Sequence, residues 1–219
     1  MRYRGSRQQM RLTVFDLDGT LTGIPNVWRH LHMKLGTWAT GRVFAQRYLD
    51  GEINYREWAE SDCALWKGTS LSRISEIISG IEYVTGAEET VNRLKEAGMK
   101  IGIVSAGISI LADRAGKDLN ADIVLSNRLL TSDGALTGGI ETAVSVDEKP
   151  KIICDIAASL SIPMHEVATV GDNVYDIPRE SGLRIAFNPK SREAEEMADF
   201  VVRNDDLRSV LEIILEETQ

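Results

Sequence analysis

Apolar residues along the chain gather in short runs bounded by turn residues. Such runs lack the apolar–polar alternation of a half-exposed strand, and they are typical of strands covered on both faces of a parallel sheet. The pattern predicts four clear strands, at residues 12–15, 101–104, 168–170 and 184–187, and two weaker ones, at 122–125 and 200–202.

Amphipathic stretches with a helical period separate these runs. The stretch 88–97 stops at a glycine, and the stretch 150–160 has proline in its first turn; both are common helix boundaries. A third helix is expected at 207–215, and Asp133-Gly134 between apolar residues predicts a hairpin. This alternation predicts an α/β fold, a Rossmann-like core whose parallel sheet is flanked by helices.

One interval between the first two strands is much longer than the crossover of about thirty residues that would join them. We therefore expect a helical cap at residues 24–84, inserted into a core formed by 10–23 and 85–219. All four tryptophans lie in this insertion, where they are expected to form the core of the cap rather than a ligand cage. The helices of the cap are expected at 27–35, 42–48, 55–66 and 72–78.

The composition and charge of the chain argue against several classes of protein. The 219 residues carry a formal charge of -8, which disfavours non-specific nucleic-acid binding. Apolar runs are too short to cross a bilayer, and the basic N-terminal tail lacks the apolar stretch of a secretory signal. Cys63 and Cys154 suggest no disulfide framework. We expect a cytoplasmic monomer or homodimer that begins at Met1 or Met10 and binds neither nucleic acid nor membrane.

Asp16 and Asp18 directly follow the first predicted strand. Positions two apart on an extended chain point to the same side, and the carboxyl end of a central strand is where open α/β sheets bind ligands. Two carboxylates there repel each other and stay ionised only beside a cation. The alternative is that Asp18-Gly19 is simply a turn that closes the strand.

Three more signals lie near other predicted strand ends. Ser105-Ala106-Gly107 supplies a hydroxyl and backbone amides that can hold phosphate oxygens. Lys149 precedes a predicted helix, and Asp172 and Asp176 are four residues apart, on one face if a helix begins there. Taken singly, each has an ordinary explanation: a strand end, a surface lysine or a helix cap.

In chain order the signals are Asp-x-Asp-Gly-Thr at 16–20, Ser105, Lys149 and Gly-Asp-x-x-x-Asp at 171–176. Together they resemble the haloacid dehalogenase superfamily, over roughly residues 11–205. The helical insertion after the first motif is similar to its phosphoserine phosphatase branch. The resemblance implies a haloacid dehalogenase-like Rossmannoid core with a small helical cap.

The same resemblance implies a Mg²⁺-dependent phosphatase acting on a small phosphorylated metabolite. Asp16 would be the nucleophile that becomes phosphorylated, and Asp18 the acid and then the base. Ser105, Ala106, Gly107 and Lys149 would bind the phosphate. The metal ligands would be Asp16, the main-chain carbonyl of Asp18, and Asp172, with Asp176 and Asn173 in supporting positions.

Two rival functions remain open. In a phosphotransferase, an alcohol other than water would take the phosphoryl group. In a phospho-ligand sensor there would be no turnover, although the intact pair of Asp16 and Asp18 argues against it. Phosphate release with and without an added alcohol separates these functions.

The cap departs from the serine-binding pattern that the resemblance implies. Pro25 and Asp62 occupy the positions where relatives have a glutamate and an arginine, so phosphoserine is not expected to be the best substrate. One hypothesis is that Asp62 and Tyr55 contact a hydroxyl-rich or cationic leaving group. The alternative for Asp62, a carboxylate on an apolar helical stripe, is a rim residue that reaches water. His30 and His32 are two apart and are not expected to bind metal.

Overall fold

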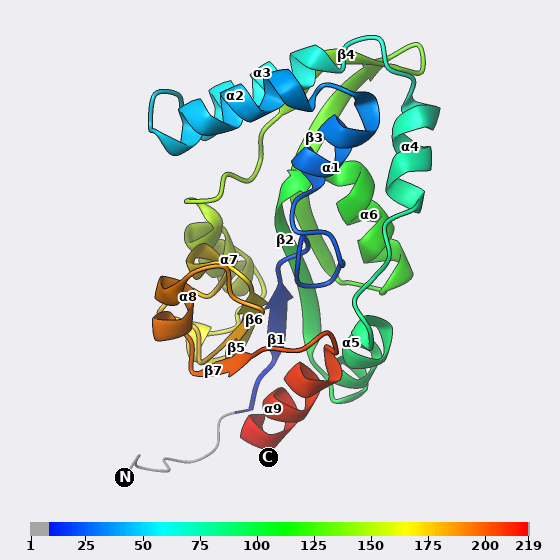
Figure 1. The fold of residues 1–219 in the computed structure, drawn as a ribbon. Helices are drawn as coiled ribbons and strands as arrows, with labels where there is room; N and C mark the ends of the chain where they lie inside the picture. Colours follow the sequence, from blue (N-terminus) through cyan, green and yellow to red (C-terminus); the bar gives the residue numbers. More distant parts are fainter. Residues whose placement is uncertain (1–8, 219) are drawn as a thin grey trace.

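The computed structural model describes residues 9–218 and contains a seven-stranded sheet (Figure 1). All neighbouring strands pair in parallel except β3 and β4, which form an antiparallel hairpin at one edge. The predicted α/β class is therefore confirmed. The strands lie in the order β4 (Ala135–Glu141), β3 (Ile123–Ser132), β2 (Lys100–Ile108), β1 (Leu12–Phe15), β5 (Val167–Gly171), β6 (Leu183–Phe187) and β7 (Phe200–Val202).

Helices cover both faces of this sheet because the central strand is apolar on both. Leu12 and Val14 of β1 belong to the apolar cluster packed against α7 (Lys149–Ser159), whereas Phe15 belongs to the cluster on the opposite face. That second cluster receives side chains from α5 (Ala87–Glu96), α6 (Ser109–Asp118) and α9 (Arg208–Thr218), and also from helices of the inserted segment.

The sequence analysis did not predict α6 or the short helix α8 (Arg192–Met197). Helix α6 follows β2 without a side-chain cap, since Ile108 precedes it, and it contains a glycine at position 116. Helix α8 spans six residues and buries only Ala194 among them. Helix α6 therefore lacks a capping signal at its start, whereas α8 has a serine cap at Ser191 but is too short to show an apolar stripe.

The inserted segment forms four helices, as predicted, at the top of Figure 1. Asn26 caps the first helix by accepting a hydrogen bond from the Arg29 N–H, and Gly36 ends it in a left-handed conformation. Trp28 packs against Trp58 and Trp66, with ring centroids 5.1 and 5.7 Å away. The helices are α1 (Val27–Leu35), α2 (Trp38–Leu49), α3 (Tyr55–Leu65) and α4 (Leu71–Ser79).

The predicted hairpin is confirmed and extends up to the cap. Asp133 and Gly134 both have positive φ, 51° and 75°, as a two-residue hairpin turn requires. The backbone N–H of Gly68 donates to the Leu136 carbonyl, and the N–H of Leu71 donates to the Gly134 carbonyl, each at 2.8 Å. The hairpin thus continues the core sheet into the cap.

No helix within residues 9–218 combines the length and the apolar character needed to cross a membrane.

Candidate active site

The carboxyl ends of β2, β1 and β5 lie side by side, and the residues that follow them meet beneath the cap (Figure 1). They line a cavity of about 420 Å³ between the core and α1, α2 and α3. The cavity is lined by Asp16, Asp18, Pro25, Asn26, Trp28, Tyr48, Leu49, Tyr55, Trp58, Ser105, Ala106, Gly107, Val146, Lys149, Asp172, Asn173, Tyr175, Asp176 and Lys190. All the predicted site residues except Asp62 are among them.

Lys149 lies between two carboxylates at the floor of the cavity. Its Nζ is 2.6 Å from Asp16 Oδ1 and 2.6 Å from Asp176 Oδ1. Burial alone would lower the pKa of Lys149, but Asp16 and Asp176 raise it above its ordinary value. The ammonium group is therefore charged at neutral pH and holds both carboxylates in place. Asp176 Oδ2 also accepts the Asn173 N–H at 2.9 Å, so both of its oxygens are engaged.

Asp18 sits against the first turn of α1. Its Oδ2 accepts the Val27 backbone N–H at 2.7 Å, and its Oδ1 is shielded from solvent without a hydrogen-bond partner among the described residues. Burial and the neighbouring Asp16 raise the pKa of Asp18 to about 7. A carboxyl group with this pKa exchanges a proton readily at neutral pH, which suits a group that both donates and accepts protons.

Asp172 faces Asp16 from the end of β5, and it contacts a residue that the sequence analysis missed. Lys190 Nζ lies 2.5 Å from Asp172 Oδ2 and donates to the Pro25 carbonyl at 2.9 Å. Burial and Asp16 raise the pKa of Asp172 to about 7. Lys190 lies just after β6, at the carboxyl end of a fourth strand. Its position after a predicted strand was the feature of the sequence that could have identified it.

Gly19 keeps this part of the site open. Its φ is +84°, and a Cβ there would lie 2.4 Å from Asp172 Oδ2. The Asp18-Gly19 turn therefore brings the backbone close to Asp172, which a larger residue would prevent.

The Ser105-Ala106-Gly107 segment is held from several directions. Ser105 Oγ accepts the Gly107 N–H at 3.0 Å. The Ala106 carbonyl accepts hydrogen bonds from Trp28 Nε1 at 3.1 Å, from the Tyr55 hydroxyl, and from Asn127 Nδ2 at 3.0 Å. Tyr55 therefore lines the cavity and also ties the cap to this loop.

Asp62 does not reach the catalytic cavity, and the interpretation of Asp62 as a solvent-exposed rim residue is wrong. Its side chain is 1% exposed, and its Oδ2 lies 3.0 Å from Nε2 of His32, which is equally buried. Burial raises the pKa of Asp62, an effect opposed by the nearby imidazole. The partner lies thirty residues away on α1, so the periodicity of α3 alone did not reveal it.

The acidic residues of the cavity fit a divalent cation that prefers oxygen ligands. Carboxylate oxygens of Asp16, Asp172 and Asp176 all lie within 4.8 Å of one another, and all three residues are buried. Both oxygens of Asp176 accept hydrogen bonds, whereas Asp16 and Asp172 are each paired with a lysine through one oxygen, so these two carboxylates are better placed as metal ligands.

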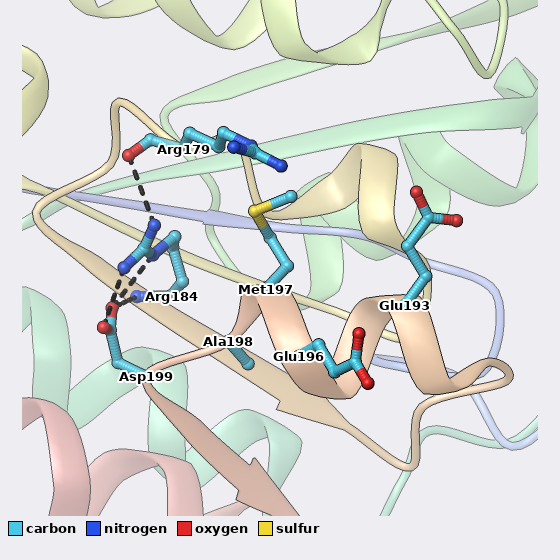
Figure 2. Close-up of a pocket in the computed structure, with 7 residues that line it drawn as sticks. All are labelled: Arg179, Arg184, Glu193, Glu196, Met197, Ala198 and Asp199. Atoms are coloured by element: carbon cyan, nitrogen blue, oxygen red, sulfur yellow. Dashed lines mark hydrogen bonds and ion pairs between the residues drawn. The ribbon is translucent and has the colours of Figure 1, made fainter.

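A second hollow, of about 520 Å³, lies on the other side of the sheet edge formed by β6 and β7 (Figure 2). Its Arg184 is the second residue of β6 and is paired with Asp199, Nη2 to Oδ1 at 2.8 Å. Arg184 therefore lies at the amino end of its strand, away from the carboxyl ends where the catalytic cavity lies. The Arg184 cation is therefore already neutralised by Asp199.

Comparisons with known proteins agree with this geometry. Residues 10–178 match the family model described as haloacid dehalogenase-like hydrolase. The phosphoserine phosphatase of Archaeoglobus fulgidus is 32% identical over 97% of this chain, which spans 62% of that relative's length. The phosphoserine phosphatase of Methanocaldococcus jannaschii is 29% identical over 94% of this chain and 99% of its own.

A solved structure, a phospho-aspartyl intermediate analogue of phosphoserine phosphatase, superposes with a TM-score of 0.81. It is 28% identical and covers 94% of this chain and 99% of its own. The chain therefore belongs to the haloacid dehalogenase-like hydrolases and is phosphoserine phosphatase-like within that family.

Proposed function

We propose that this protein is a Mg²⁺-dependent phosphomonoester hydrolase that acts on a small phosphorylated metabolite through a phospho-aspartyl intermediate on Asp16. The observation that carries the proposal is the pairing of two adjacent carboxylates in different surroundings. Asp16 lies against the Lys149 ammonium group, whereas the shielded Asp18 has a pKa of about 7. One is suited to attack as an anion, and the other is suited to carry a proton.

In the first step, a carboxylate oxygen of Asp16 attacks phosphorus, and the bond between phosphorus and the ester oxygen breaks. Asp18 gives its proton to the departing alkoxide, so that a neutral alcohol leaves. In the second step, Asp18 takes a proton from water as the water oxygen attacks phosphorus. The bond between phosphorus and Asp16 then breaks, which releases inorganic phosphate and restores both carboxyl groups.

The phosphoryl oxygens would be held by Ser105, by the backbone N–H groups of Ala106 and Gly107, and by Lys149. All four residues line the cavity, and Lys149 is fixed by its two carboxylate partners. These donors stabilise the negative charge of the transferring group without needing to reorganise during the reaction.

Asp16, Asp172 and the main-chain carbonyl of Asp18 would hold Mg²⁺, and Asp176 and Asn173 would position Lys149 and the loop around Asp172. When bound, the ion neutralises phosphoryl oxygens and offsets the repulsion among the carboxylates. The support for this assignment is the buried group of carboxylates described above.

The test measures phosphate release from p-nitrophenyl phosphate and from a panel of phosphorylated metabolites that includes phosphoserine, with Mg²⁺ or after chelation. Asp16→Asn is expected to lower kcat by at least about a thousandfold. Asp155→Asn, which changes an exposed carboxylate on the helix that carries Lys149, serves as the matched control. Full turnover after chelation, or in Asp16→Asn, would refute the proposal. Equal yields of free phosphate with and without added alcohol favour a hydrolase over a phosphotransferase.

A further inference from the structure

A second cavity, of about 240 Å³, lies inside the cap between α1, α2 and α3. It adjoins the catalytic cavity, because the two share residues of their walls. Its lining is mostly apolar and aromatic, with contributions from Trp28, Trp38, Tyr48 and Trp58. The residues common to both cavities are Asn26, Trp28, Tyr48, Leu49 and Trp58.

The inner wall of this cap cavity carries polar atoms that lack partners. Asp62 Oδ1 and Trp58 Nε1 are buried and make no hydrogen bond within the described part of the chain. Asp62 Oδ2 is paired with His32 Nε2 at 3.0 Å, so Oδ1 is the oxygen of this carboxylate left without a partner. A buried carboxylate left in this state is costly unless another donor completes it.

The histidine beside Asp62 is held in a fixed position. Its Nδ1 lies 2.7 Å from Thr37 Oγ1, which also accepts the Trp66 indole N–H at 3.2 Å. A Cβ on Gly41 would lie 2.6 Å from the imidazole ring, so α2 leaves just enough room for the ring. The Asp62–His32 pair is therefore a built feature of the cap rather than a mobile surface contact.

We propose that the cap cavity receives the alcohol part of the substrate, and that this part has a flat apolar body ending in an ammonium group without a carboxylate. The proposal rests on the hydrolase function proposed above and specifies its substrate class. The ammonium group would donate to Asp62 Oδ1, the atom that lacks a partner.

The charge of Asp62 and the aromatic lining of the cap cavity favour a substrate with an ammonium group alone over the phosphate ester of an amino acid. Asp62 is the acidic residue that lines the cap cavity, and it would repel a substrate carboxylate. Indole and phenol rings attract a cation over their faces and stack well on a flat apolar body. Arg29 also lines the cavity, but it is exposed and its guanidinium lies over the Trp38 ring, 5.4 Å from its centroid.

The test compares three phosphate esters on the full chain with Mg²⁺. O-phosphotyramine has the ammonium group alone, O-phosphotyrosine adds a carboxylate, and phenyl phosphate has neither. We expect kcat/KM for O-phosphotyramine to exceed that for O-phosphotyrosine by about tenfold, the effect of one buried charged contact. Asp62→Asn should reduce this ratio to within about threefold. Glu60→Gln, an exposed change on the same helix, should preserve the ratio.

Equal efficiencies for the two amines in the unaltered protein overturn the inference, and so does an unchanged ratio in Asp62→Asn. A preference for O-phosphotyrosine, as expected if Arg29 binds the carboxylate, also overturns it. Calorimetric binding of tyramine and tyrosine, in the unaltered protein and in Asp62→Asn, tests the cavity without turnover. If no ester is hydrolysed but tyramine binds through Asp62, the hydrolase proposal fails and the cavity assignment stands.

Discussion

Asp16 and Asp18 differ in proton affinity because of what each carboxylate touches. Lys149 Nζ lies 2.6 Å from Asp16, whereas Asp18 accepts a hydrogen bond from the Val27 backbone N–H. Burial and the charge of Asp16 therefore raise the pKa of Asp18 to about 7. Two neighbouring carboxyl groups in unequal surroundings divide the work of nucleophile and acid, a pattern found in other hydrolytic sites.

Asp18→Asn should affect substrates according to their leaving groups. An alkyl alkoxide needs a proton to depart, so turnover of an alkyl phosphate should fall by roughly 10²- to 10⁴-fold. p-Nitrophenolate leaves without a proton, so the variant should still phosphorylate Asp16 but hydrolyse the intermediate slowly. Stopped-flow absorbance should then show a burst of p-nitrophenol close to one per enzyme. An equal loss on both substrates without a burst would contradict this division of roles.

Lys190 would compete with the proposed Mg²⁺ for the same oxygen of Asp172. Its ammonium group lies 2.5 Å from Asp172 Oδ2, and its side chain is 45% exposed, so solvent screens much of the interaction. Lys190→Met should therefore tighten Mg²⁺ binding by roughly three- to tenfold. Calorimetric titration measures the change, and Lys151→Met, an exposed lysine paired with Asp155, is the control. Weaker Mg²⁺ binding in Lys190→Met would mean that Lys190 organises Asp172 for the ion.

At the scale of elements, Asp122 joins the start of β3 to β2. It accepts the Ile101 N–H at 2.9 Å and contacts Lys100 Nζ at 3.0 Å, and its side chain is 20% exposed. Partial burial alone would raise the pKa of Asp122, but the Ile101 N–H and the lysines beside it, including Lys95, lower it.

A carboxyl group whose folded pKa is lowered stabilises the fold above its unfolded pKa, and this contribution is lost as pH falls through the folded value. Asp122→Asn should thus lower the free energy of unfolding by about 1 kcal/mol at pH 7. The difference from the unaltered protein should shrink at about pH 3.5, below the unfolded pKa of aspartate. Urea unfolding at both pH values measures it, with exposed Asp113→Asn as control. A difference that is constant with pH would exclude the charge as its cause.

Elements with local signals were predictable from the sequence, and those that depend on distant partners were not. The strand at 12–15 was expected at its observed bounds, because a short run that is apolar except for Thr13 precedes a charged turn. The hairpin at Asp133 followed from its Asp-Gly turn. By contrast, the buried state of Asp62 depends on His32 of another helix, and the placement of Lys190 depends on the way β6 ends beside β5.

At the scale of the whole molecule, hydrogen bonds at the hairpin and at Ala106 help to join the cap to the core. The hairpin accepts and donates backbone hydrogen bonds at residues 68–71, and the cap residues Trp28 and Tyr55 bond to the Ala106 carbonyl beside the catalytic cavity. A movement of the cap away from the core would have to break the contacts at Ala106. Any movement of the cap would therefore act on the 105–107 segment, which is proposed to bind phosphate.

Negative charge gathers where cap and core meet, and this concentration should make stability depend on Mg²⁺. Four carboxylates line one cavity, those of Asp16, Asp18, Asp172 and Asp176. Among the residues that line it, only Lys149 and Lys190 carry positive charge. An ion that binds the folded chain alone stabilises it by roughly 2.7 kcal/mol at a hundred times its Kd. For a chain of this length, that corresponds to a rise in Tm of roughly 5–10 °C.

Differential scanning fluorimetry with Mg²⁺, and again after addition of a chelator, measures this rise. Asp172→Asn should unfold at a higher temperature than the unaltered protein without Mg²⁺, because one repelling carboxylate is gone. It should also lose most of the Mg²⁺-dependent rise, because a proposed ligand is gone. The control Asp155→Asn should keep the full rise. If Asp172→Asn gained as much from Mg²⁺ as the unaltered protein, the ion would be bound somewhere other than the edge of the sheet where the chemistry is proposed.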